Sequence, residues 1–220
     1  MSILDKRGFT MVELMVSMVF ISVLLLAIAM LILQITSIYN KGLTMREANQ
    51  TGQFITSELQ RALNQTYTEE VFYEDMPGGS GARLCAGTTI YAWNYADHLD
   101  NGTNRIGGSA DVRFVKFNGS PDDYCVEGDD GWSSPNIPSD ATELLAEGNS
   151  NIALHSFTFG RGDVTDDSTQ TIYSMTMVVG TTNTGLIIGN NCQADDKIAD
   201  ERCAINEFRF TARSGDKEDT

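Results

Sequence analysis

An apolar segment near the N-terminus constrains this chain more than any other feature of its sequence. Residues 16–33 carry no charge, and only Ser17 and Ser22 interrupt their apolar side chains. A helix of about 18 such residues meets the lower length limit for crossing the hydrocarbon core of a bilayer. We therefore predict one transmembrane helix, with its membrane-spanning part at about residues 14–36.

The rest of the chain is polar and acidic. The 220 residues have a net charge of −15, yet residues 1–65 hold five cations and four anions. The remainder therefore carries −16, and it is rich in Gly, Asn, Asp and Thr. Because such a surface repels phosphate backbones, we expect a soluble head that as a whole does not bind nucleic acid.

A single acid, Glu13, lies within the apolar region. The N-terminal segment can be interpreted in three ways, and only one of them accounts for an acid at this position. A cleaved secretory signal needs a short apolar core and a small-residue cleavage site, but no Ala-x-Ala sequence closes the run before Gln34. A plain signal anchor fits the length, and Lys6 and Arg7 would hold its N-terminus in the cytoplasm. It leaves unexplained an acid that costs about 2.5–3.5 kcal/mol near the centre of a membrane helix.

The third kind of segment explains Glu13 together with Gly8. Residues 8–13 read Gly-Phe-Thr-Met-Val-Glu and lead into the apolar run, a pattern that resembles the signal of type IV prepilins. In that family a membrane-embedded aspartic peptidase cuts after the glycine and methylates the new terminal amine. The resemblance makes residues 1–8 a leader peptide, places cleavage between Gly8 and Phe9, and makes Phe9 the methylated residue.

Glu13 then stands at the fifth position of the mature chain, where the family carries its glutamate. A buried carboxylate is costly alone and far less costly when it is paired. The amine of Phe9 on a neighbouring subunit would be such a partner. We therefore expect Glu13 to fix the axial register of helices that pack side by side in a fibre.

Helical spacing continues beyond the membrane-spanning part and predicts one amphipathic helix over residues 9–64, about 84 Å long. Ile55, Leu59 and Leu63 form a stripe that we expect to pack on the head. Gly42 and Gly52 mark positions where the helix could bend. Residues 47–63 also resemble, less specifically, the corresponding segment of minor subunits, which favours a minor, large-headed subunit.

Alternating residues predict a β-rich head over residues 65–220. Tyr91, Trp93 and Tyr95 share one face, and Asn118-Gly119 is typical of a hairpin turn after a strand at 112–117. Further strands are predicted at 152–159, 173–179, 186–188 and 205–212, with a long surface excursion over 118–150. The predicted fold class is α+β, a long N-terminal helix packed on an antiparallel sheet, which is the pilin fold.

Four cysteines follow the apolar run, as expected for two disulfides in an oxidising compartment. Three pairings are possible, and free thiols are the alternative. We favour Cys85 with Cys125 and Cys192 with Cys203. The second pair would close a loop of about a dozen residues, and it resembles the disulfide-bounded C-terminal loop of many pilins.

No residue pattern in the sequence indicates catalysis. Nucleophile motifs, phosphate-binding loops and metal-ligand clusters are absent, so we predict that the chain is not an enzyme. Two groups of oxygen-bearing residues could bind Ca²⁺, but we expect solvated surface acids and no cofactor. These groups are Asn190, Asn191, Asp195, Asp196 and Asp200, and Asp163, Thr165 and Asp167.

The resemblance implies a structural subunit of a type IV pilus or of a type II secretion-like fibre. Such a subunit would lie in the bacterial cytoplasmic membrane as a single-pass protein, with its N-terminus in the cytoplasm, and afterwards in an extracytoplasmic fibre. Its partners would be membrane lipid, prepilin peptidase, the inner-membrane assembly platform and other pilin subunits. The alternative is a membrane-anchored extracytoplasmic sensing or ligand-binding domain that never polymerises.

Overall fold

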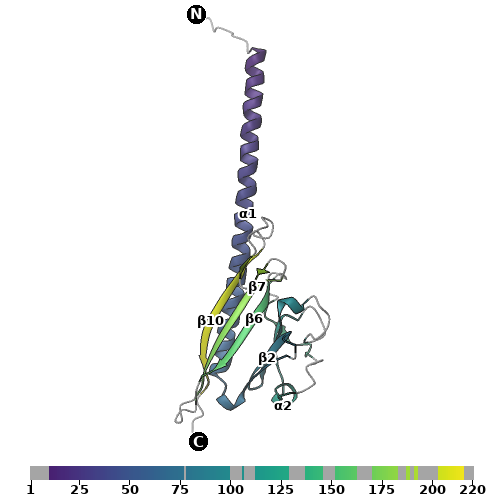
Figure 1. The fold of residues 1–220 in the computed structure, drawn as a ribbon, viewed down its shortest axis with the longest axis vertical. Helices are drawn as coiled ribbons and strands as arrows, with labels where there is room; N and C mark the ends of the chain where they lie inside the picture. The colour runs from purple at the N-terminus through teal and green to yellow at the C-terminus, as the bar shows by residue number, and fades with distance from the viewer. Residues whose placement is uncertain are drawn as a thin grey trace, which may run out of the picture.

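The long N-terminal helix projects from a β-rich head in a computed structural model of the chain (Figure 1). The structure describes residues 10–76, 78–99, 106, 112–128, 137–145, 152–162, 170–182, 187–188, 191–192 and 203–215. The head lies against the C-terminal half of the helix and leaves the N-terminal half uncovered (Figure 1). The predicted α+β class, a long helix packed on antiparallel strands, is confirmed.

The helix α1 runs from Met11 to Asn64 without interruption. Its 54 residues give a length of about 81 Å. The helix continues through Gly42 and Gly52, so neither glycine breaks it. Phe9, where the predicted helix begins, lies outside the described residues.

The strands form two main antiparallel sheets, where the sequence had led us to expect one. The first has the order β1 (Val71–Asp75), β2 (Gly81–Ala86), β3 (Thr89–Asn94), β4 (Phe114–Asn118) and β5 (Thr142–Glu143). The second has the order β10 (Ile205–Arg213), β7 (Ile172–Thr181) and β6 (Ile152–Arg161). A small ribbon of β8 (Ile187–Ile188) and β9 (Asn191–Cys192) and the short helices η1 (Thr68–Glu70), η2 (Ala96–His98) and α2 (Pro121–Tyr124) complete the described elements.

The hairpin predicted at Asn118-Gly119 is wrong. The Gly119 N–H donates to the Thr88 carbonyl oxygen, 2.9 Å away, and the chain then enters α2. The outer neighbour of β4 is β5, which comes about twenty residues later in the sequence. The Asn-Gly dipeptide therefore ends a strand here without turning the chain back on it.

The helix packs mainly on the three-stranded sheet, along β10 (Figure 1). Ile55, Leu59 and Leu63 are fully buried there, as their spacing predicted, in one core with apolar side chains of β7 and β10. Gly52 allows the close approach. A Cβ atom at this position would lie 2.2 Å from Cε2 of Phe208, whose ring occupies the space between α1 and β10.

Stacked aromatic rings join the two sheets. Trp93 lies parallel to Phe114 with ring centroids 5.0 Å apart, both in the five-stranded sheet. The Trp93 ring also meets Phe157 of the three-stranded sheet at 4.6 Å, and Tyr73 stacks on Phe159 at 4.9 Å. Because these buried rings come from both sheets and contact one another, the two sheets share one hydrophobic core.

The structure pairs the cysteines as favoured from the sequence. Cys85 and Cys125 form one disulfide with Cα atoms 6.3 Å apart, and Cys192 and Cys203 form the other with Cα atoms 5.8 Å apart. Both separations are ordinary for disulfides. All four cysteines of the chain are therefore bonded.

We predict that Gly52→Ala destabilises the head by about 1–2 kcal/mol, because the Phe208 ring must leave its place against α1. Gly42→Ala is the matched control, since no heavy atom lies within 4 Å of a Cβ built at Gly42. The control should be neutral or stabilising by up to about 1 kcal/mol. Denaturant unfolding of the full chain in detergent would measure both, and equal effects of the two substitutions would refute this role of Gly52.

Candidate functional site

The predicted assembly residue, Glu13, lies in the first turn of α1 and is bonded to the residue that caps the helix. The Glu13 N–H donates to Oγ1 of Thr10 at 3.3 Å. The Glu13 carboxylate accepts bonds from the Thr10 N–H at 3.0 Å and from the Thr10 hydroxyl at 2.9 Å. This reciprocal arrangement is a capping box, and it satisfies backbone N–H groups that the start of a helix leaves without partners.

The capping box gives Glu13 a role within its own chain, besides the one expected of it in a fibre. Thr10 and Glu13 have the Ser/Thr-x-x-Glu/Gln spacing that signals such a box, so the pattern was available in the sequence. Among the described residues, no cation is paired with the Glu13 carboxylate. The predicted cleavage residues Gly8 and Phe9 lie outside the described part of the chain.

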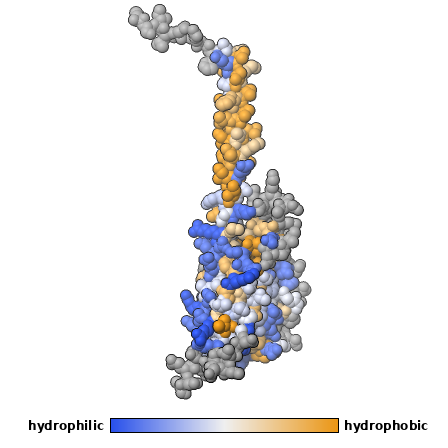
Figure 2. Space-filling view, turned by 60° about the vertical axis from the view of Figure 1, so that its left-hand side comes forward, coloured by the Kyte–Doolittle hydropathy of each residue, from blue (hydrophilic) through white to orange (hydrophobic). Residues whose placement is uncertain are grey.

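The surface of α1 that follows Glu13 is almost entirely apolar and exposed (Figure 2). Large apolar side chains between Met11 and Met45 are more than two-fifths exposed, whereas Ala48 is buried by the head. In length and composition α1 could cross a membrane, which supports membrane anchoring. Glu13 therefore lies at the N-terminal end of a long, uncovered apolar surface.

A second polar arrangement ties α1 to the five-stranded sheet. The Lys116 ammonium donates to the Glu58 carboxylate, and the Tyr91 hydroxyl donates to the same oxygen of Glu58 at 3.4 Å. The bond from Lys116 holds the pKa of the Glu58 carboxyl below its ordinary value, against the effect of burial. Burial and the nearby Glu58 charge raise the pKa of Tyr91. No local sequence pattern predicted this contact, since Glu58 and Lys116 are far apart in the chain.

A cavity of about 670 Å³ opens beside this contact, between the end of α1 and the turn from β2 to β3. Its lining carries both signs of charge. Arg61 and Lys116 are the cations, and Glu58, Glu69 and Glu70 are the acids. Such a lining suits a polar ligand that carries charge of both signs.

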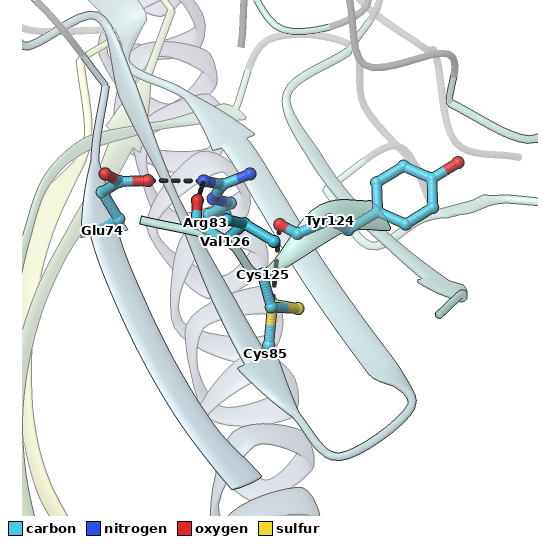
Figure 3. Close-up of a disulfide and its surroundings, with 6 residues drawn as sticks. All are labelled: Glu74, Arg83, Cys85, Tyr124, Cys125 and Val126. Atoms are coloured by element: carbon cyan, nitrogen blue, oxygen red, sulfur yellow. Dashed lines mark hydrogen bonds and ion pairs between the residues drawn. A yellow bond between two sulfur atoms is a disulfide. The ribbon is translucent and has the colours of Figure 1, made fainter. Parts of the chain in front are cut away.

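The Cys85–Cys125 disulfide is part of a larger attachment on β2 (Figure 3). The buried Arg83 donates to the Glu74 carboxylate at 2.5 Å and to the Val126 carbonyl oxygen at 2.6 Å. The Gly128 N–H donates to the other oxygen of Glu74 at 3.0 Å. The disulfide and these bonds hold residues 125–128 firmly on the sheet, where half-exposed Val126 forms part of the head's surface.

The described part of the chain contains no group of three or more His, Cys, Asp or Glu side chains placed to hold a metal ion. Of the residues considered for Ca²⁺, only Asn191 is described, and the acids lie outside the described residues. His155 is largely buried, and its Nε2 lies 2.9 Å from the Thr181 carbonyl oxygen. Burial lowers the pKa of His155, which favours a neutral structural histidine.

Comparisons of the chain with models of protein families, with curated proteins and with solved structures found no match.

We predict that Lys116→Met destabilises the head by about 1 kcal/mol at neutral pH, after allowance for solvent screening. Because the pKa of Glu58 is lowered in the folded chain, the stabilisation is complete above the ordinary carboxyl pKa of 4.5. It disappears as the pH falls through the lowered value. The difference in unfolding free energy between the natural chain and the variant should therefore shrink in acid.

Chemical denaturation of both proteins between pH 7 and pH 3 would measure this difference. Lys116→Arg, which keeps the cation, should retain most of it. A difference that is independent of pH, or that grows in acid, would contradict the assigned ion pair.

Proposed function

We propose that this chain is a structural subunit of a type IV pilus or a type II secretion-like fibre, most closely resembling the minor pilins and minor pseudopilins. The observation that carries the proposal is the position of Glu13, an acid in the first turn of a long and uncovered apolar helix. The sequence Gly-Phe-Thr-Met-Val-Glu at residues 8–13 supports it.

The energetics of Glu13 favour assembly over solitary anchoring. A carboxylate close to the hydrocarbon core is costly, and hydrogen bonds from one threonine neutralise none of its charge. An amine on a neighbouring helix would supply both charge and hydrogen bonds, which reduces the cost of burial. Lateral contacts between apolar helices are weakly directional, so one such ion pair would decide how far each helix is shifted along the next.

Cleavage after Gly8 would create this amine at Phe9 and would act as the switch for assembly. In the single chain, Thr10 holds the Glu13 carboxylate in the capping box. In the fibre, the methylated amine of Phe9 from an adjacent subunit would replace or join Thr10 as its partner. Prepilin peptidase, the inner-membrane assembly platform and other pilin subunits would be the protein partners.

The head would face the extracytoplasmic side, where an oxidising compartment favours its two disulfides. Its size relative to the helix suits a subunit that initiates or caps a fibre or that displays a binding surface. The surface around residues 125–128 is suited to display, because the disulfide and Arg83 fix it to β2.

A specific observation favours a second candidate function. The charged cavity beside Glu58 and Arg61 would suit a sensing or ligand-binding head that is anchored by α1 and never polymerises. In that case Glu13 would serve only as a capping residue, and the chain would keep its first eight residues.

Terminal sequencing of the protein isolated from its native membrane separates these functions. The fibre proposal expects a chain that begins at Phe9 with a methylated amine. The anchor alternative expects Lys6 and Arg7 to be retained. An intact N-terminus in cells that process other prepilins would overturn the fibre proposal.

We further predict that Glu13→Ala leaves membrane insertion intact but lowers incorporation into fibres at least tenfold, because the pairing of carboxylate and amine is lost. Thr10→Ala is the matched control, since it removes the threonine side chain from the capping box but keeps the carboxylate. Quantitative detection of the subunit in sheared fibres and in membranes would measure both variants. Unchanged incorporation of Glu13→Ala would refute the proposed role of Glu13.

A further inference from the structure

The cavity beside the Glu58–Lys116 ion pair lies at the opposite end of α1 from Glu13. It opens between the C-terminal end of the helix and the turn from β2 to β3, with a volume of about 670 Å³. Cavities that hold small molecules in proteins have volumes of about 300–1,000 Å³. The cavity therefore has the size of a ligand-binding site, and its lining indicates the class of ligand.

Two charged side chains of the lining are available to a ligand. Arg61 lies in the last turn of α1, three residues after Glu58 and therefore on the same face of the helix. Glu70 is the last residue of η1. Both are exposed, and among the described residues neither side chain makes a hydrogen bond or an ion pair, whereas Glu58 and Lys116 are paired with each other. Arg61 and Glu70 can therefore each bind a group of opposite charge.

The backbone fixes the position of Glu70 at the cavity. The Gly87 N–H donates to the Glu70 carbonyl oxygen at 3.1 Å, so the end of η1 is bonded to the turn between β2 and β3. Gly87 has a φ of 60°, a left-handed conformation that favours glycine. A Cβ atom built there would lie 3.5 Å from Oε2 of Glu70. The Glu70 carboxylate therefore lies close to this turn, whereas Arg61 belongs to the wall that α1 forms.

Uncharged polar side chains of the lining suit peptide groups. Gln65, Thr88 and Thr89 offer hydrogen-bond donors and acceptors, and their side chains make no hydrogen bond in the part of the chain that the structure describes. Peptide N–H and C=O groups need such partners when they leave water. A short peptide, charged at its two ends and polar between them, matches both parts of the lining.

Other classes of ligand match this lining less well. A polyanion such as a nucleotide would meet the carboxylates of Glu58, Glu69 and Glu70, which outnumber the two cations of the cavity. A neutral sugar would cover Arg61 and Glu70 without pairing either charge, which costs free energy. A ligand with an ammonium at one end and a carboxylate at the other avoids both penalties.

We propose that this cavity binds a short peptide with free ends, whose terminal carboxylate pairs with Arg61 and whose terminal ammonium pairs with Glu70. The Arg61 guanidinium can donate two parallel hydrogen bonds to a carboxylate. The negative C-terminal end of the α1 dipole lies at the same cavity and adds to the attraction of Glu70 for an ammonium. The site does not rest on the fibre proposal, since the head can bind a peptide in a fibre or in a single anchored chain.

Calorimetric titration of the full chain in detergent with trialanine tests the site. An extended tripeptide is about 10 Å long, and its methyl side chains leave binding to its ends and its peptide groups. Three blocked forms are the matched ligands: N-acetyl-trialanine lacks the ammonium, trialanine amide lacks the carboxylate, and N-acetyl-trialanine amide lacks both. We expect trialanine to bind with a millimolar or lower dissociation constant, and the block of either end to weaken binding at least tenfold.

Two substitutions in the cavity assign the ends of the peptide. Arg61→Gln should abolish the difference in affinity between trialanine and its amide, because the carboxylate has lost its partner. Glu70→Gln should abolish the difference between trialanine and the acetylated form. Misfolding would remove both differences at once, so the loss of one alone identifies the partner. Arg161→Gln and Glu127→Gln are the matched controls, since both residues are exposed and lie outside the cavity, and they should bind all four ligands like the natural chain.

Each outcome decides for or against the site. Absence of trialanine binding, or equal binding of trialanine and its doubly blocked form, overturns it. Equal effects of the cavity substitutions and their controls assign the binding to general surface charge and also overturn it. The same holds if each cavity substitution abolishes the difference expected of the other. Terminal sequencing continues to test the fibre proposal separately, because none of these results depends on how the N-terminus is processed.

Discussion

One continuous helix has to satisfy two different surroundings, and the rest of the structure depends on this constraint. The head covers α1 only from Ala48 onward, where Ile55, Leu59 and Leu63 are buried against the three-stranded sheet. The apolar side chains of its N-terminal part are exposed. Because α1 is unbroken between the two parts, one continuous helix connects them.

The polar groups of α1 follow the same division. Near the uncovered end, Glu13 is bonded to Thr10. At the covered end, Glu58 receives the Lys116 ammonium and reaches the Tyr91 hydroxyl, so its charge is compensated within the chain. Among the described residues no cation pairs with Glu13, whereas Glu58 is paired with Lys116. Two glutamates of one helix are therefore distinguished by what surrounds them.

Periodic patterns of apolar residues predicted several helices and strands of the structure. The apolar run and the Ile55 stripe predicted α1, and alternation predicted most of β3, β6, β7 and β10. The strand β2 was missed because its sequence, Gly-Ala-Arg-Leu-Cys-Ala, has none of the β-branched or aromatic residues that mark a strand. The division into two sheets depends on contacts between distant segments, such as Trp93 with Phe157, that no local pattern encodes. Both cysteine pairings were predicted from the sequence, the assembly role of Glu13 stays a prediction, and the capping role of Thr10 was overlooked.

The place of β10 in the fold affects how the chain can be made. This strand, the last in the described residues, provides the closest packing on α1, the first helix. A ribosome makes the chain from its N-terminus, so α1 is synthesised before β10. The apolar stripe of α1 therefore stays uncovered by β10 until residues 205–213 have been made. Leu59 and Leu63 are buried only once the head has folded against them. Closure of the head is thus a late step, completed only when β10 has packed on the part of α1 that follows Ala48.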